Sequence, residues 1–221
     1  MAENNRPAWQ EAARVFDQRA TEYDSWYDDS LLFAIELAAL RDLQTPLADP
    51  RVEVGCGPGR FAAELGVVLG IDPAWTPLTL AASRLIGVSQ GVAEQLPLRW
   101  EAIGTLFVLF TLCFVEDPLQ VFREADKVLR PGGHLVLGLV PGDGPWGRAL
   151  AAKGRAGHPF YRYASFYNVA QVEQWLATVG FRLVEQRSSL YQGPGELQGF
   201  ESSQAGRSQE AGFVVLVARK G

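Results

Sequence analysis

The sequence predicts an α/β domain built around a mainly parallel sheet. From Arg51 onward, short apolar segments alternate with segments of helical periodicity, the pattern of parallel strands joined by helices. Residues 106–110 are apolar at every position, as expected of a strand buried on both faces. Residues 52–54 form an apolar strand that runs directly into a turn with glycine at alternate positions, 55, 57 and 59. The 221 residues suit a single domain.

The segment before the sheet predicts a helical cap. In residues 7–20, Trp9, Ala13 and Phe16 fall on one helical face, and Ser30 can cap a second helix over residues 31–43. Between these helices, residues 23–30 combine aromatic and acidic side chains. They fit either a solvated interhelix loop or a lid over a ligand. We expect residues 1–45 to cover the open edge of the sheet.

The core is expected over residues 51–140, with a turn at Pro131-Gly132-Gly133. Its strands and helices are predicted in this order: strand 52–54, helix 61–65, strand 67–71, helix 76–86, strand 88–93, strand 106–110, helix 117–129 capped by Asp117, and strand 134–140.

The last third contains a long segment of low periodicity. Residues 141–167 are rich in glycine, proline and aromatic side chains, and a segment of this length in a compact domain is usually functional. Asn168 can cap a helix over residues 169–179, closed by Gly180. Residues 181–190 and 213–218 are predicted strands without a helix between them, so we expect an antiparallel pair within residues 168–221. Residues 191–207 read as a polar connection.

Composition disfavours several classes of protein. The net charge of -5 and the lack of a basic run disfavour a nucleic-acid partner. No apolar run has membrane-spanning length, so no membrane partner is expected. The two cysteines lack metal-ligand spacing, which predicts no metal and a reduced, cytoplasmic protein. The polar start MAENNRPAWQ predicts no signal peptide. The oligomeric state is not encoded in any visible pattern.

The glycine-rich turn is typical of a nucleotide or nucleoside site, because glycine lets a ligand lie against bare peptide. Glu53 precedes the first glycine by two residues, giving E-x-G-x-G-x-G. A dinucleotide pattern fits only loosely, counted from Gly57 to Ala62. A tight turn without a ligand is the plain structural alternative. Asp72, at the end of the second core strand, can accept hydrogen bonds from both hydroxyls of a ribose, or can cap the following helix.

Several segments together resemble the class I S-adenosylmethionine-dependent methyltransferases, in their small-molecule branch. E-x-G-x-G-x-G resembles motif I of that family, and the other segments occur in the family's order along most of the chain. They are GVAEQLPL at 91–98, DKVLRPGGHLVLG at 126–138, and VFDQRATEYDSWYD at 15–28. The resemblance implies a Rossmann-like doubly wound seven-stranded sheet of order 3-2-1-4-5-7-6, with only strand 7 antiparallel. It implies S-adenosyl-L-methionine as the cofactor and methyl transfer to a small-molecule acceptor as the activity.

The same resemblance implies which residues bind the donor. It assigns Glu53 to the methionine ammonium group, Asp72 to the ribose, and Tyr23 to the donor's carboxylate or sulfonium. The remaining implied positions lie in the glycine turn, beside the adenine and at the end of the fourth strand. They are Gly55, Cys56, Gly57, Gly59, Pro73, Ala93, Glu94, Phe110 and Thr111.

Two positions depart from the family pattern. Val92 stands where the family has an aspartate that contacts the adenine amino group, and Glu94 or the backbone at Ala93 could take its place. Residues 100–104 lack the family's usual F-D strand start. Val92 motivates an alternative function, a module that binds S-adenosylmethionine or S-adenosylhomocysteine without transfer. A nicotinamide-dependent oxidoreductase is a third alternative.

The acceptor side is less defined. His158, in the segment 141–167, is the candidate base, because histidine can take a proton near neutrality, and its plain alternative is a packing role. Tyr23 is a second candidate catalytic residue. His134 reads as structural. The aromatic residues between Phe160 and Tyr167 could line an acceptor pocket or pin the segment to the sheet. The acceptor and the methylated atom are not readable from the sequence.

Overall fold

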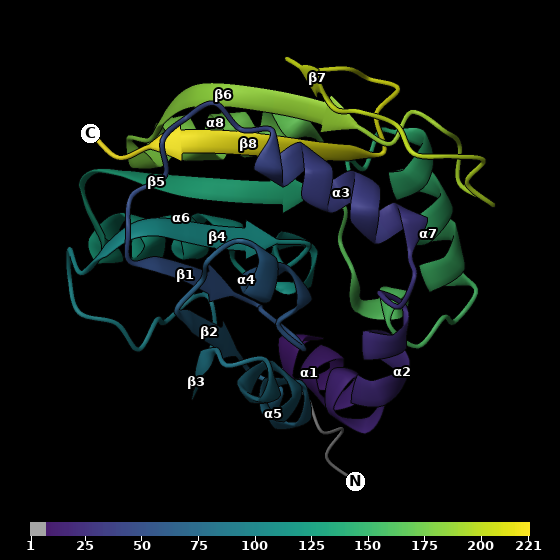
Figure 1. Ribbon diagram of the computed structural model, residues 1–221, viewed down its shortest axis with the longest axis horizontal. Helices are drawn as coiled ribbons and strands as arrows, with labels where there is room; N and C mark the ends of the chain where they lie inside the picture. Colours follow the sequence, from purple (N-terminus) through teal and green to yellow (C-terminus); the bar gives the residue numbers. More distant parts are fainter. Residues whose placement is uncertain (1–7) are drawn as a thin grey trace, which may run out of the picture.

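The computed structural model describes residues 8–221 and shows one sheet with helices on both faces (Figure 1). The predicted segments at residues 1–7, including Pro7 and most of the polar amino-terminal stretch, lie outside the described residues. The sheet order is β3-β2-β1-β4-β5-β8-β6-β7. Its strands are β1 (Arg51–Val54), β2 (Leu69–Asp72), β3 (Gly87–Gln90), β4 (Ile103–Leu109), β5 (Leu129–Leu139), β6 (Arg182–Ser189), β7 (Gln204–Ala205) and β8 (Phe213–Arg219).

Strand direction follows the expected doubly wound pattern. The pairs β2–β3, β1–β2, β1–β4 and β4–β5 are parallel, and β8 is antiparallel to both β5 and β6. The fold class and the order 3-2-1-4-5-7-6 are therefore confirmed, with predicted strands six and seven corresponding to β6 and β8. The strand count is corrected from seven to eight. The two-residue β7, inside the expected polar connection, pairs antiparallel with the edge strand β6.

Helices cover both faces of the sheet, and further helices lie beyond the carboxyl ends of its parallel strands. They are α1 (Ala8–Gln18), α2 (Ala20–Ser25), α3 (Leu31–Arg41), α4 (Arg60–Glu64), α5 (Trp75–Ser83), α6 (Pro118–Val128), α7 (Pro145–Arg155) and α8 (Val169–Val179), with the short 3-10 helices η1 (Leu112–Phe114) and η2 (Tyr161–Tyr163). In the described part of the chain, every helix is too short or too polar to cross a bilayer.

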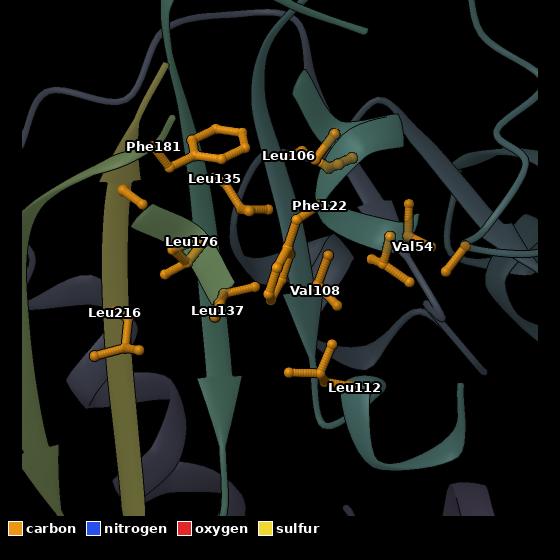
Figure 2. Packing of buried hydrophobic residues seen from close by; sticks show 14 of the residues in the cluster. Val54, Leu106, Val108, Leu112, Phe122, Leu135, Leu137, Leu176, Phe181 and Leu216 are labelled. Atoms are coloured by element: carbon orange, nitrogen blue, oxygen red, sulfur yellow. The ribbon is translucent and has the colours of Figure 1, made fainter. Parts of the chain in front are cut away.

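The alternating side chains of β4 show how the two layers form. Leu106 and Val108 point to the face covered by α6 and α8, where Phe122 fills the centre of the cluster (Figure 2). Phe107 and Leu109 point to the opposite face, which α3 and α4 cover. All seven residues of β4 are buried, as expected from its continuous apolar run.

Capping residues set several helix boundaries as predicted. The side chains of Ser30, Asp117 and Asn168 each accept a hydrogen bond from the third residue beyond them, at the starts of α3, α6 and α8. Gly180 ends α8 in the left-handed conformation that glycine tolerates.

The turn predicted at Pro131-Gly132-Gly133 is wrong, because these residues lie within β5. Ile103 pairs with Leu129 and Thr105 pairs with His134, so five residues of β5 advance against two residues of β4. The surplus residues form an irregularity in the strand, and Gly132 takes a φ of +75° within it. The strand thus begins immediately after α6 instead of after the glycines.

The segment 141–167 is more regular than its low periodicity predicted. It contains the helix α7 and the turn η2. Pro145 at the first helical position and the basic residues of the last turn are start and stop signals, but Gly147 and Gly154 obscure the helical pattern. Both glycines are needed for packing, because a Cβ on either would lie within 2.5 Å of a backbone carbonyl oxygen.

Truncation of the aromatic side chain at the centre of the core should lower stability strongly. Phe122 is fully buried, so Phe122→Ala is expected to lower the free energy of unfolding by about 3–5 kcal/mol through lost burial and a residual cavity. Phe200→Ala is the matched control, because Phe200 is 59% exposed. Urea denaturation of both variants checks this. Equal losses for the two would contradict the packing described above.

Candidate functional site

A cavity lies beyond the carboxyl ends of β1, β2 and β4, where open α/β sheets place their ligands. We call it the strand-end cavity. Nine of the predicted site residues line it: Tyr23, Gly55, Gly57, Asp72, Pro73, Ala93, Glu94, Phe110 and Thr111. Val92 also lines it, together with Trp9, Ala12, Ala13 and Phe16 from α1. The strand ends and α1 therefore enclose one site.

The glycine turn forms one wall of this cavity through close backbone contact. Gly55, Gly57 and Gly59 all have φ between +50° and +79°. A Cβ on Gly55 would lie 2.0 Å from Oγ1 of Thr111. At Gly57 a Cβ would meet only a ring carbon of Tyr23, at 3.5 Å, so it would project into the cavity. Bare peptide is therefore required at the first position for packing and leaves room for a ligand at the second.

Asp72 lies at the cavity wall with both carboxylate oxygens bonded to backbone. Its Oδ2 accepts from the N–H of Gly57 at 2.9 Å, and its Oδ1 accepts from the N–H of Ala74 at 2.8 Å. Burial raises the pKa of Asp72 to about 6, although these N–H groups act in the opposite direction. Each carboxylate oxygen has a second lone-pair position, so the side chain can still accept hydrogen bonds from a ligand's hydroxyls.

Three of the predicted donor-binding residues do not line the cavity. Cys56 packs on the other side of the turn against Leu78 and Ala81 of α5. Gly59 lies against the same helix, where a Cβ would come 2.9 Å from Cβ of Ala81. Glu53 is buried in the first strand, and burial raises the pKa of its carboxyl group well above the ordinary value. Its Oε2 has no hydrogen-bond partner.

Helices α1 and α2 lie beyond the strand ends (Figure 1). Tyr23 of α2 lines the strand-end cavity. The Tyr23 ring packs edge-on against Phe16 of α1, and its hydroxyl lies 2.7 Å from the hydroxyl of Tyr27. Burial raises the pKa values of both phenols above the ordinary value of 10. Tyr23 is thus a half-buried helical residue, unlike a residue of a solvated loop.

Asp24 ties α2 to the core through two arginines. Arg60, at the start of α4, binds the Asp24 carboxylate at 2.7 and 2.9 Å, and Arg84, after α5, binds it at 2.9 and 3.0 Å. These cations hold the pKa of Asp24 below its ordinary value despite partial burial. Arg60 also binds Asp28. Helix α2, which covers the cavity, is therefore attached to the core next to the glycine turn.

A second cavity opens beside the first and is lined almost wholly by apolar side chains. We call it the aromatic cavity. It is enclosed by α2, α3, α7, η1, η2 and the end of β5. Four aromatic residues line both cavities and form a shared wall: Phe16, Tyr23, Phe110 and Phe114.

Phe110 holds an uncommon backbone conformation at this wall. Its φ is +55°, a region that bulky side chains rarely adopt. Its N–H donates to the carbonyl of Gly138 at 2.8 Å, and its ring stacks on Phe213 at 4.9 Å. The strained residue is thus held by the sheet on one side and by an aromatic stack on the other, between the two cavities.

His158, the predicted base, lines neither cavity. Its ring stacks on Tyr161 at 4.6 Å, burial lowers its pKa, and its Nδ1 has no hydrogen-bond partner. Tyr161 and Phe160, its neighbours, do line the aromatic cavity. His158 therefore lies outside both cavities and packs against Tyr161, which lines the aromatic cavity.

Glu36 is a cavity residue that was not predicted from the sequence. This residue of α3 is 7% exposed and lines the aromatic cavity. Burial raises the pKa of its carboxyl group to about 8. The sequence does contain a pattern that could have identified Glu36 as a candidate site residue. It is the one acidic residue inside the apolar helical stretch LLFAIELAAL. No cluster of potential metal ligands occurs among residues 8–221.

The residues around Val92 show what faces the expected adenine position. Val92 supplies an apolar side chain to the strand-end cavity. The nearby carboxylate of Glu94 accepts a hydrogen bond from the N–H of Glu116 through Oε1 at 2.9 Å. Ala93 is buried in the core cluster. Among residues 92–94, only Glu94 and the backbone carry groups that could hydrogen-bond an adenine.

Comparison with known proteins places these features in context. A family model described as a methyltransferase domain matches residues 52–137. An uncharacterised protein of Mycobacterium tuberculosis is 42% identical over 94% of this chain and 74% of its own length. A Thermotoga maritima crystal structure of a SAM-dependent methyltransferase, a possible histamine N-methyltransferase, has a TM-score of 0.87 at 29% identity, covering 95% of this chain and all of that one. A tRNA U34 carboxymethyltransferase of Methylococcus capsulatus is 33% identical over 62% of this chain and 46% of its own length.

Breaking the Asp24 contacts should loosen the helical cover. Asp24→Asn removes the charge that both arginines bind, so amide hydrogen exchange across residues 20–25 should speed up markedly. Asp28→Asn is the matched control, because its exposed carboxylate binds only Arg60 among the described residues. Exchange in β4 should stay unchanged in both variants. Equal protection of α2 in wild type and Asp24→Asn would argue against this attachment.

Proposed function

The chain belongs to the class I S-adenosylmethionine-dependent methyltransferases, and we propose that it methylates a small molecule bound in its aromatic cavity. The observation that carries the proposal is the shared wall. One cavity has the position and residues of a nucleoside site, the other is lined mainly by apolar side chains, and four aromatic residues line both. A donor in the strand-end cavity and an acceptor in the aromatic cavity would therefore be neighbours. Both would contact the shared residues Phe16, Tyr23, Phe110 and Phe114.

The residues of the strand-end cavity fit S-adenosylmethionine. The Asp72 carboxylate can accept from ribose hydroxyls, and the space beside Gly57 suits a ligand lying on bare peptide. Pro73, Val92 and Ala93 offer an apolar slot for the adenine, which supports donor binding without the family's aspartate. Tyr23 can shield a sulfonium with its ring, an interaction worth about 0.5–2 kcal/mol.

Glu53 is proposed to interact with the methionine ammonium group of the donor, although its side chain does not line the strand-end cavity. Its unpartnered Oε2 is an unsatisfied acceptor close to the glycines, which supports a role toward the methionine ammonium group. Because it does not line the cavity, that role requires the turn to adjust or a water to bridge. Cys56 and Gly59 are proposed to shape the turn against α5, with no direct contact to the donor.

When bound, S-adenosylmethionine supplies an already activated methyl group, so the protein's main tasks are alignment and exclusion of water. Correct alignment of two reactants is worth about 7–11 kcal/mol in well-oriented systems. The cover formed by α1 and α2, held by Asp24, is suited to exclude water from the strand ends. The fixed ring of Phe110 is suited to orient the acceptor.

A nucleic-acid acceptor is the second candidate, because a tRNA-modifying protein is among the relatives. The net charge of -5 and the absence of Lys, Arg or His from the described lining of the aromatic cavity favour a small apolar acceptor. Family membership favours transfer over a binding module and over a nicotinamide oxidoreductase. A cytoplasmic location is also proposed, supported by the two unpaired cysteines.

Donor binding should depend on Asp72. Isothermal titration with S-adenosylhomocysteine is expected to show at least about tenfold weaker binding by Asp72→Asn, since the amide replaces one acceptor oxygen with a donor. Asp143→Asn, an exposed position outside both cavities, is the control. Thermal melting would verify that both variants are folded. Unchanged affinity in Asp72→Asn would remove the ribose assignment.

Acceptor binding should depend on the volume of the aromatic cavity. Leu150→Trp on α7 narrows this cavity, so the KM for a small aromatic acceptor should rise at least about tenfold while the Kd for S-adenosylhomocysteine stays unchanged. Leu150→Met is the volume-conserving control. Formation of S-adenosylhomocysteine with small aromatic acceptors and with total tRNA provides the readout. Turnover with tRNA that is insensitive to Leu150→Trp would favour the nucleic-acid candidate.

A further inference from the structure

The aromatic cavity contains one acidic side chain among its described lining residues, Glu36. Tyr23, Tyr27, Tyr161 and Tyr167 are the phenols around it, and Cys113 contributes a thiol. Burial raises the pKa values of Tyr161 and Cys113 to about 12. The groups that surround Glu36 are therefore neutral at physiological pH, and none of them offers a positive charge.

Glu36 differs from the other buried carboxylates of the described chain in lacking a partner. Asp72 accepts two backbone N–H groups, Glu124 binds Lys127 and the N–H of Leu96, and the N–H of Ala62 hydrogen-bonds Glu53. No hydrogen bond or ion pair connects Glu36 to a described residue, and burial alone accounts for its raised pKa. An uncompensated buried carboxylate is costly, so its position at a cavity wall points to a partner supplied by a ligand.

Building on the proposed function, we propose that the methyl acceptor carries a basic nitrogen that binds Glu36, with the rest of the acceptor packed among the aromatic rings. A nitrogen with N–H groups supplies the hydrogen-bond donors that the carboxylate lacks. A positive charge also gains from the faces of Tyr27, Trp26 and Phe33, which line the same cavity. The acceptor class is thus an aromatic or apolar amine.

Glu36 would also free the nitrogen lone pair. An amine enters from water as an ammonium ion, which cannot attack a methyl group. One N–H bond breaks, its electron pair stays on nitrogen, and the proton forms an O–H bond with the Glu36 carboxylate. Two opposite charges become two neutral groups, a change that an apolar cavity favours. The proton returns to solvent after the product leaves. The raised pKa of Glu36, about 8, suits this exchange with an amine.

The central test measures binding to the protein–S-adenosylhomocysteine complex, so it does not depend on turnover. The probes are benzylamine, phenethylamine and tryptamine, each compared by calorimetry with the alcohol of the same carbon skeleton. At pH near 8, wild type should bind at least one amine about tenfold or more tightly than its alcohol. Glu36→Gln should lose this preference, and Glu210→Gln, at an exposed position outside the cavities, should keep it.

Several outcomes would overturn the inference. They are equal binding of amines and alcohols, a preference retained by Glu36→Gln, and the failure of every amine to bind. If methyl transfer proceeds to phenols and is insensitive to Glu36→Gln, the inference fails while the proposed function stands. If wild type does not bind S-adenosylhomocysteine, the proposed function itself fails, and the inference fails with it.

Stability provides a readout that needs neither donor nor acceptor. The Glu36 pKa rises on folding from the ordinary 4.5 to about 8, so the unfolded chain ionises first as pH rises. The wild-type free energy of unfolding therefore decreases progressively as pH rises from about 4.5 to about 8. Glu36→Gln should melt near the wild-type temperature at pH 4 and above it at pH 8, while Glu210→Gln follows wild type. A melting difference that does not change with pH would show that the carboxylate is not isolated, contrary to the inference.

Discussion

The close approach between the glycine turn and the end of β4 constrains the whole site. Oγ1 of Thr111 occupies the place where a side chain on Gly55 would be, and the same hydroxyl donates to the carbonyl of Leu109 at 2.9 Å. Because β1 and β4 are neighbouring parallel strands, their carboxyl ends meet at this contact. The strand-end cavity opens on one side of it. Phe110, the next residue back, faces both cavities.

The helical cover depends on that same region. Asp24 is bound by Arg60, which follows the glycine turn, and by Arg84, which follows α5. The residues that form the turn and the residues that anchor the cover are thus adjacent in space. The anchored helix α2 carries Tyr23, which lines both cavities.

The site also carries features that oppose stability. Phe110 has a strained backbone, Glu36 is a buried carboxylate without a partner, and Oε2 of Glu53 lacks a hydrogen bond. Each costs free energy in the unliganded protein, and all three lie at or beside the two cavities. The packed core around Phe122, in contrast, contains no such defect and supplies the stability that offsets them. Unfavourable features of this kind beside a cavity are typical of a site shaped for a ligand.

The sequence by itself determined the sheet order, the glycine turn, Asp72 and most of the strand-end residues. These depend on short-range patterns: alternation of strands and helices, caps such as Ser30, and a motif of contiguous residues. Tertiary structure alone decided the helix in residues 141–167, the irregularity at Gly132 and the exclusion of Cys56 and His158 from the cavities. It also decided the burial of Glu36 at a cavity wall. Those features depend on which side chains from distant segments meet. Packing determines whether an ionisable side chain is buried and whether it has a partner. A sequence pattern does not show which residues from distant segments surround that side chain.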